Sequence, residues 1–231
     1  MALTALIIIV LIFSIIIHEY GHAWMANRLG DSTAKDLGRL TLNPIPHIDL
    51  FGSIILPFFF ILSQSGFILA WAKPVPYNPN RIKDKKYGDL KVAIAGPLSN
   101  IIIATFFGLV VRLLPVAANI KQGLFLSFLS RDNDVLNSLI AGNIWHSIIL
   151  LSIIFIFINL LLAFFNLIPI PPLDGSKIVL NFLPEKLKYK ALSIERYGLF
   201  IVLILLMTGL FRLIIIPIIY SFSFLSGINL F

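Results

Sequence analysis

Long apolar segments are the feature that most restricts how this sequence can fold. The chain has 231 residues, 58% of them hydrophobic, and its mean hydropathy is +0.96, whereas soluble domains contain about 45–50% apolar residues. A helix needs about 20 apolar residues to cross a bilayer. Five segments reach that length, at about 2–27, 51–72, 92–118, 139–173 and 197–225. The sequence therefore predicts an all-α, polytopic membrane protein with four to five transmembrane helices.

The polar intervals between these segments are too short to hold a soluble domain, which usually has at least about 50 residues. We therefore expect one membrane-embedded domain over residues 1–231. Its core would lie at about 1–183, followed by an additional C-terminal transmembrane helix at about 197–225. The first apolar segment lacks the basic start and the small-residue cleavage site of a signal peptide, so we expect it to be retained.

The basic residues are concentrated in three loops, and this predicts the orientation in the membrane. Of the 18 Lys and Arg residues, 14 lie in the loops at 28–39, 73–91 and 177–196. A net charge of +7 would suggest nucleic acid as the partner of a soluble protein, but basic loops beside apolar spans mark the cytoplasmic side of a membrane protein. We expect no nucleic-acid partner and place the three loops in the cytoplasm.

This orientation puts both ends of the segment at 51–72 on the same side of the membrane. Pro57 and the polar run SQSG at 63–66 are places where a helix can break and turn. We therefore expect a re-entrant hairpin at 51–72, with a plain spanning helix as the alternative.

The first apolar segment contains three ionisable residues, His18, Glu19 and His22, in the sequence HEYGH. A carboxylate inside a membrane helix costs about 3 kcal/mol, so this group needs partners. His18 and His22 are four residues apart and project from one helix face, at a spacing that a single metal ion can bridge. Glu19 could take a proton from a water molecule activated by zinc and return it to a leaving amine. The pattern therefore predicts peptide hydrolysis, the alternative being a chance arrangement of buried helix residues.

A catalytic zinc ion usually has three protein ligands and one open position, so a third ligand is needed. The chain contains no cysteine, which leaves His47, His146 and the carboxylates as candidates. Several acids lie in loops that are expected to be solvated, namely Asp84, Asp89, Asp132, Asp134 and Glu195. Asp174 differs, because three prolines before it favour an extended approach and Gly175 after it frees the backbone to turn. Alternatively, Asp174 is the N-cap of a short helix at 175–183.

Three motifs together resemble the site-2 protease family of intramembrane zinc metalloproteases: HEYGH at 18–22, AGPLSN at 95–100 and NLIPIPPLDG at 166–175. The resemblance implies a zinc metalloendopeptidase that cleaves transmembrane-segment protein substrates within the lipid bilayer. It further implies a multi-pass protein of a prokaryotic plasma membrane, with the active site toward the cytoplasmic side. The chain has no room for a PDZ or other regulatory domain, so we expect a compact form of the family.

The resemblance implies a role for each of five residues. His18, His22 and Asp174 would hold one zinc ion per chain, and Glu19 would be the catalytic base. Asn166 would face the site and donate a hydrogen bond to the oxyanion that forms at the scissile carbonyl. Alternatively, the Asn166 side chain satisfies helix backbone groups that the following proline leaves free.

The segment after the first helix has short alternating apolar positions, Leu40 and Leu42. In the family such a segment resembles a small membrane-associated β element, here at about 33–48, that could pair with an extended substrate. His47 lies at the end of this segment, and we expect a structural or gating role for His47 in preference to metal binding.

The motif AGPLSN contains small residues at a spacing that lets helices approach closely. Gly96 and Ser99 are therefore interpreted as packing residues, and Asn100 is not expected to be catalytic.

Two other classes of protein have to be weighed against a protease. A metal-binding membrane transporter would need several ionisable residues distributed along its spans, whereas this chain has one compact cluster. A non-catalytic membrane protein that binds helices would not need the carboxylate of Glu19. Both remain alternatives to the intramembrane protease.

Overall fold

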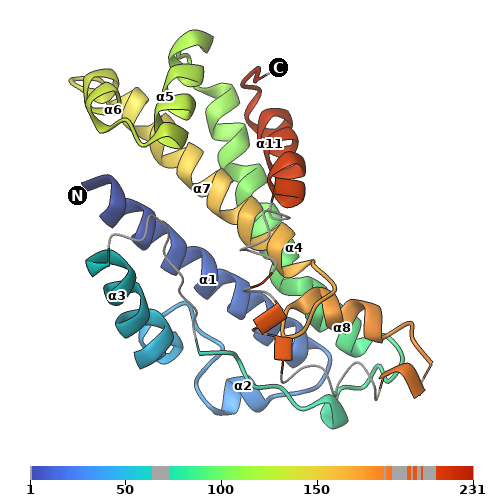
Figure 1. Cartoon of the computed structure of the whole chain (residues 1–231). Coiled ribbons are helices and arrows are strands. Elements are labelled where there is room, and N and C mark those ends of the chain that lie inside the picture. The colour runs from blue at the N-terminus through green and yellow to red at the C-terminus, as the bar shows by residue number, and fades with distance from the viewer. Residues whose placement is uncertain are drawn as a thin grey trace. The chain divides into compact units, whose positions relative to one another are not determined.

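The computed structural model describes residues 2–63, 73–184, 186–188, 197–198, 200–201, 204 and 212–230. The regular secondary structure of these residues is entirely helical (Figure 1). The α-helices are α1 (Ala2–Arg28), α2 (Thr33–Asp36), α3 (Leu56–Leu62), α4 (Gly88–Leu113), α5 (Ala118–Ser130), α6 (Asn133–Ile140), α7 (Ile144–Asn166), α8 (Asp174–Leu180) and α11 (Arg212–Ser226). Two short 3-10 helices, η1 (Ile45–His47) and η3 (Pro79–Arg81), and one π-helix, η2 (Leu50–Ile55), complete the described elements.

Three of these helices, α1, α4 and α7, are long and apolar enough to cross a membrane. They are rich in Ile and Val, which are mediocre helix formers in water. In lipid, however, every backbone polar group must be satisfied within its own segment, so an apolar run of this length becomes helical. The chain is therefore an integral membrane protein with three candidate spans among the described residues.

The four to five spans predicted from the sequence are not confirmed. The last apolar segment is represented by α11, an apolar helix of only 15 residues, and most of residues 199–211 lie outside the described part. The segment at 51–72 is described only as far as residue 63.

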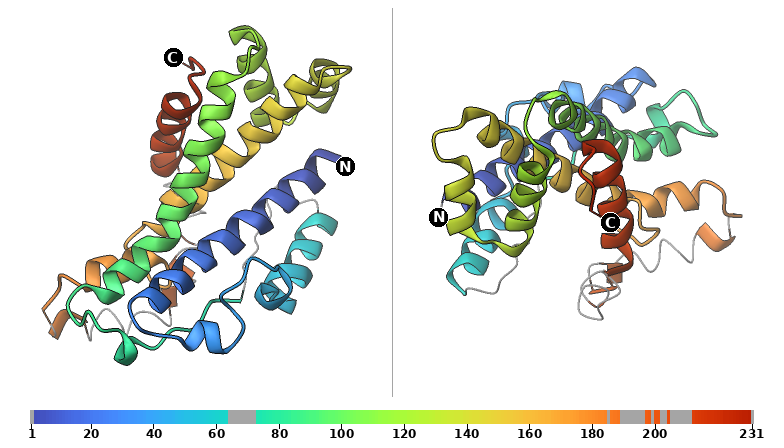
Figure 2. Two further views of the ribbon diagram at one scale, coloured as in Figure 1. Left: turned by 180° about the vertical axis from the view of Figure 1, so that it is seen from behind. Right: turned by 90° about the horizontal axis from the view of Figure 1, so that it is seen from above.

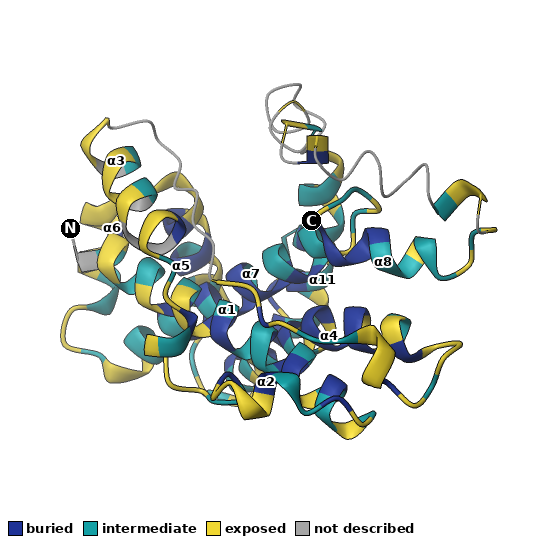
Figure 3. Ribbon diagram, turned by 90° about the horizontal axis from the view of Figure 1, so that it is seen from below, coloured by how far each residue is buried: buried dark blue, intermediate teal, exposed yellow. Residues whose placement is uncertain are grey.

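The first half of the predicted re-entrant hairpin is helical. The π-helix η2 leads directly into α3, and Pro57 lies in the first turn of α3, a position where proline is tolerated. Figure 3 shows α3 as a largely exposed helix, and the side chains of Phe58, Phe59 and Leu62 are among its exposed apolar groups. The returning half at 64–72 lies outside the described residues, so the hairpin stays a prediction.

The predicted β element at 33–48 is not confirmed, because the segment contains α2, η1 and turns but no strand. Asp31 starts α2 by accepting hydrogen bonds from the backbone N–H and the hydroxyl of Thr33. Leu40 packs beside a small buried cluster, whereas Leu42 is exposed. The two leucines therefore differ in environment, since Leu40 faces the protein and Leu42 faces outward, and neither lies on a strand.

The contacts within the chain divide it into two compact units. One unit comprises residues 1–11, 100–165 and 200–231. Its core contains the fully buried Phe125 of α5 and Phe222 of α11, whose rings stack with centroids 4.2 Å apart. In the same unit α5 and α6 lie side by side (Figure 2), and the amide of Asn100 donates to Asn159 Oδ1 at 2.8 Å.

The other unit comprises residues 12–99 and 166–199. It contains HEYGH, NLIPIPPLDG and all but the last residue of AGPLSN. The chemistry predicted from these motifs therefore belongs to one unit. The prediction of a single domain over 1–231 stays a prediction.

Candidate metal centre

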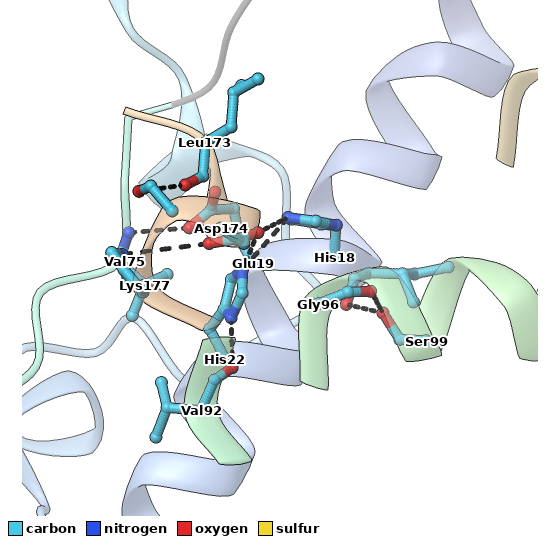
Figure 4. A network of polar contacts seen from close by, with 12 residues as sticks. His18, Glu19, His22, Val75, Val92, Gly96, Ser99, Leu173, Asp174 and Lys177 are labelled. Carbon is cyan, nitrogen blue, oxygen red and sulfur yellow. Dashed lines mark hydrogen bonds and ion pairs between the residues drawn. The ribbon is translucent and has the colours of Figure 1, made fainter. Parts of the chain in front are cut away.

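Two histidines and one aspartate of this unit meet at a single point (Figure 4). Nε2 of His18 and Nε2 of His22, both on α1, lie 3.1 Å from each other. Each also lies 3.1 Å from Oδ2 of Asp174, the first residue of α8. In the described part of the chain, this is the one group of three or more His, Cys, Asp or Glu side chains arranged to hold a metal ion.

A backbone carbonyl sets the protonation of His22. Nδ1 of His22 lies 2.7 Å from the carbonyl oxygen of Val92 on α4, and because a carbonyl can only accept, we assign the proton of the neutral imidazole to Nδ1. Nε2 then carries a lone pair that faces Oδ2 of Asp174. Two acceptors at 3.1 Å repel each other unless a proton or a cation lies between them, so the arrangement favours a bound cation.

The three donor atoms leave room for one metal ion. They form a triangle with sides of 3.1 Å, and its centre lies about 1.8 Å from each atom, slightly less than the 2.0–2.2 Å of zinc–nitrogen and zinc–oxygen bonds. The three side chains would therefore hold one zinc ion and leave a fourth position open for water or substrate. Two imidazoles and one carboxylate are also a common ligand set of catalytic zinc.

The crossing of α1 and α4 brings small residues against the two imidazoles. A Cβ atom on Gly96 would lie 2.3 Å from Nε2 of His22 and 2.8 Å from Cε1 of His18. A Cβ atom on Gly21 would lie 2.7 Å from the carbonyl oxygen of Ala95. The predicted close packing at Gly96 is confirmed, and its contact with the histidines is an additional finding.

The chain reaches Asp174 through tight turns, which corrects the expected extended approach. Ile170 N–H donates to the carbonyl of Ile168, and Leu173 N–H donates to the carbonyl of Ile170. The prolines end α7, as predicted, but these backbone hydrogen bonds fold the segment back on itself.

Asp174 is not the N-cap of the following helix, which corrects the alternative raised above. The N-cap is Leu173, and α8 begins with Asp174 itself. Gly175 is needed for close approach, because a Cβ atom there would lie 2.2 Å from the carbonyl oxygen of Leu167. The Asp174 carboxylate is thereby left to face the histidines.

Glu19 lies beside this group but is held by a different element. Its Oε2 accepts a hydrogen bond of 2.8 Å from the backbone N–H of Val75 (Figure 4). Sequence reasoning missed Val75 and Val92, since both act through backbone atoms that no residue type reveals.

A comparison with protein families decides the class of this protein. The model of peptidase family M50 matches residues 6–209. The chain belongs to peptidase family M50. The predicted resemblance to site-2 proteases is thereby confirmed, and the protein is a metalloprotease whose cofactor is zinc.

Individual relatives of this M50 peptidase support the same class. It is 36% identical over 217 residues to YwhC of Bacillus subtilis, covering 94% of this chain and 87% of the relative. It is 27% identical over 218 residues to Rip2 of Mycolicibacterium smegmatis, covering 94% and 73%. Both are named provisionally as zinc metalloproteases, and MJ0392 of Methanocaldococcus jannaschii, a named zinc metalloprotease, is 27% identical over 219 residues, covering 94% and 46%. No solved structure matches significantly.

The second oxygen of Asp174 in the M50 peptidase faces a lysine. Nζ of Lys177, one turn further along α8, lies 3.9 Å from Oδ1 of Asp174 and 5.6 Å from the ring centre of Tyr77. Burial, followed by the charges of Asp89 and Asp174, raises the pKa of Tyr77 to about 12.

The other two histidines have different partners. His47 is buried, its Nε2 donates to the carbonyl of Thr41 at 2.9 Å, and it is not part of the three-residue group. His146 has Nδ1 2.6 Å from the carbonyl oxygen of Leu139. Neither is placed as a third ligand, and the structural or gating role expected for His47 stays a prediction.

The remaining candidate acids serve the ends of helices or pair with cations. Asp84 forms an ion pair of 2.7 Å with Lys91, and Asp132 caps α6. Asp89 and Asp134 lie in the first turns of α4 and α6. Glu195 lies outside the described residues.

Asn166 is the last residue of α7 and is half-buried. It belongs to the same unit as the metal-site residues. Its predicted action on the oxyanion stays a prediction.

Proposed function

We propose that this M50 peptidase hydrolyses a peptide bond within or near a transmembrane segment of a membrane-protein substrate. The observation that carries the proposal is the meeting of His18, His22 and Asp174 within 3.1 Å, with both histidines on a candidate membrane span. A zinc site at that position favours substrates that are themselves in the membrane. A soluble substrate would have to reach a site carried by an apolar helix.

His18, His22 and Asp174 would hold the zinc ion. When bound, zinc lowers the pKa of a coordinated water to about 7 and polarises a carbonyl group. Glu19 is the proposed base. Because Val75 N–H engages Oε2, Oε1 is the atom we assign to accept the proton of the attacking water and deliver it to the leaving nitrogen.

Asn166 is proposed to donate from its side-chain amide to the oxyanion, where a preorganised donor is most effective.

The substrate helix has to be unwound before it is cleaved, because a helix keeps its backbone carbonyls in hydrogen bonds to the N–H groups four residues later. Lateral entry of a substrate helix, local unwinding and exposure of one carbonyl to the site would complete the reaction path.

The active site is proposed to open toward the cytoplasm of a prokaryotic cell. His22 lies six residues before the end of α1 at Arg28, and the loops at 28–39 and 73–91 that follow are strongly basic. Basic loops favour the cytoplasmic side.

The test is cleavage of a model transmembrane peptide by the purified protein in nanodiscs, with and without a zinc chelator. We expect cleavage that the chelator abolishes. Glu19→Gln should keep zinc and lower turnover by about 10²–10⁴-fold, the usual contribution of a general base. Wild-type turnover by this variant would remove Glu19 as the base.

The same assay separates the alternative functions. Metal flux into liposomes without cleavage would indicate a transporter, and peptide binding without cleavage would indicate a non-catalytic helix-binding protein. Faster cleavage of a water-soluble version of the peptide would contradict a membrane-embedded substrate.

A further inference from the structure

A segment without regular secondary structure passes beside the Glu19 carboxylate, and we call residues 73–78, KPVPYN, the strap. The strap is fixed near both of its ends. At one end Lys73 N–H donates to the carbonyl of His47 at 2.9 Å. At the other end Asn78 N–H donates to Oδ2 of the buried Asp31 at 2.6 Å. Between them Val75 N–H holds Glu19.

The composition of the strap isolates this one donor. Proline has no N–H, so with Pro74 and Pro76 on either side, Val75 provides the strap's one backbone donor between Lys73 and Tyr77. The Val75 side chain is buried in a small cluster with Ala23 of α1, which fixes the position of its amide. Figure 4 shows Val75 N directed at Glu19.

Arg39 clamps the strap next to Val75. Its guanidinium nitrogen Nη2 donates to the carbonyls of Lys73 at 2.8 Å and Pro74 at 3.2 Å. The Arg39 residue is only 8% exposed, its Nε has no hydrogen-bond partner, and no described carboxylate forms an ion pair with it. Burying an arginine without a counter-ion is unfavourable, so its two hydrogen bonds to strap carbonyls point to a role in fixing the strap.

We propose that Val75 and Arg39 are positioning residues for Glu19. The inference rests on the proposed function, in which Glu19 is the base. Val75 N–H anchors Oε2 so that Oε1 keeps a constant place beside the metal site, and Arg39 holds Val75 where it can do so. Such precision matters because a displacement of about 1 Å at a reacting group can lower a rate about 100-fold.

The first test removes the amide hydrogen with Val75→Pro and measures kcat, KM and bound zinc. We expect kcat to fall at least about tenfold while KM and zinc stoichiometry stay within about twofold of wild type. Val75→Ala keeps the amide, so its kcat should exceed that of Val75→Pro by about fivefold or more. Pro76→Ala changes an exposed residue of the same strap and is the matched control. Its kcat should equal that of wild type. Equal kcat for Val75→Pro and Val75→Ala would overturn the proposal.

The second test compares Arg39→Gln with Arg39→Lys. Gln should lower kcat at unchanged zinc content, and Lys, which retains a charged donor, should restore at least about half of the lost activity. Arg28→Gln is the matched control, because Arg28 lies over the Trp24 ring and does not contact the strap. A loss of kcat for Arg39→Gln that is matched by an equal loss of bound zinc would mean that Arg39 supports the whole site and does not position Glu19.

The third test does not depend on activity. Hydrogen–deuterium exchange at the Val75 amide should accelerate at least tenfold in Glu19→Ala, and strap exchange should accelerate in Arg39→Gln but not in Arg28→Gln. Unchanged Val75 exchange in Glu19→Ala would overturn the inference even if the protein cleaves its substrate. Accelerated exchange in a protein that cleaves nothing would support the contact and refute the proposed function.

Discussion

At the scale of single residues, His22 illustrates how one backbone oxygen decides what a side chain can bind. The Val92 carbonyl places the proton on Nδ1, so Nε2 carries a lone pair that faces His18 and Asp174. A partner of this kind fixes both the tautomer and the ring orientation of a metal-binding histidine. The Asp174 carboxylate then adds the negative charge that a divalent cation needs where water is scarce.

Asp174 gives the sharpest prediction at this scale. Asp174→Ala removes one of three donor atoms, so bound zinc measured by atomic absorption should fall from one per chain to less than about one tenth, as loss of a ligand weakens binding more than the 10–100-fold that outer partners contribute. Asp84→Ala is the matched control, because that half-buried carboxylate pairs with Lys91 and is not part of the three-residue group. Unchanged zinc in Asp174→Ala would identify a different third ligand.

The residues of HEYGH were predictable because helix periodicity alone puts His18 and His22 on one face. Asp174 is 156 residues from His18 in the sequence, and only its motif pointed to the site. Val75 and Val92 contact Glu19 and His22 across 56 and 70 residues through backbone atoms. Such contacts are set by the tertiary fold, and no residue type at positions 75 or 92 indicates them.

At the scale of elements, the crossing of α1 and α4 couples helix packing to metal binding. Gly96→Ala would place a methyl group 2.3 Å from Nε2 of His22, so an imidazole has to move. We expect zinc affinity to fall about 10–100-fold, the effect of disturbing a ligand's surroundings, although Ala is a better helix former than Gly by about 1 kcal/mol.

The matched control for Gly96→Ala is Gly123→Ala in α5, where a new Cβ atom would meet nothing closer than 3.7 Å. That change should leave zinc binding alone and raise stability by about 0.5–1 kcal/mol. Competition with a fluorescent zinc chelator measures the affinities. Equal affinities in the two variants would contradict the coupling.

Asp31, which follows α1, accepts a hydrogen bond from Asn78 of the strap, and this bond depends on the charge of the Asp31 carboxylate. Burial alone would raise the pKa of Asp31, but hydrogen bonds from Thr33 and from Asn78 N–H outweigh it and hold the pKa below its usual value. A carboxylate with a lowered folded-state pKa stabilises the protein above its unfolded pKa of about 3.9, and this stabilisation is lost as the pH falls through the folded pKa.

Asp31→Asn should therefore lower the Tm by a constant amount between about pH 5 and 8. The difference from wild type should shrink below about pH 4, where the wild-type carboxylate takes up its proton. Differential scanning fluorimetry in detergent measures both. A difference that grows on acidification would contradict the assigned direction of the pKa.

Element prediction succeeded for the long apolar helices and failed for short segments. The alternation of Leu40 and Leu42 was too brief to specify a strand, and the hydrogen bonds from Thr33 to Asp31 lie at the start of a helical turn instead. The prolines before Asp174 were correctly read as ending a helix, but the turns that follow depend on hydrogen bonds between backbone groups of the same loop. Helix α5 was missed because its apolar run is short and begins after polar residues.

At the scale of the whole molecule, the basic loops and the metal centre lead to one topological prediction. The loop that contains the strap has six of the 18 basic residues, and the strap holds Glu19. If basic loops are cytoplasmic, the Glu19 carboxylate is reached from that side. The loop between α4 and α7 would then lie outside.

The absence of native cysteine makes this topology directly testable with single-cysteine variants. Asn80→Cys follows the strap, and Asn137→Cys lies on α6, at exposed positions. We expect a membrane-impermeant maleimide to label Asn137→Cys in intact cells, and Asn80→Cys only after the membrane is opened. Labelling of Asn80→Cys from outside would contradict this topology, because either the whole orientation is reversed or the segment at 51–72 crosses the membrane and is not a re-entrant hairpin.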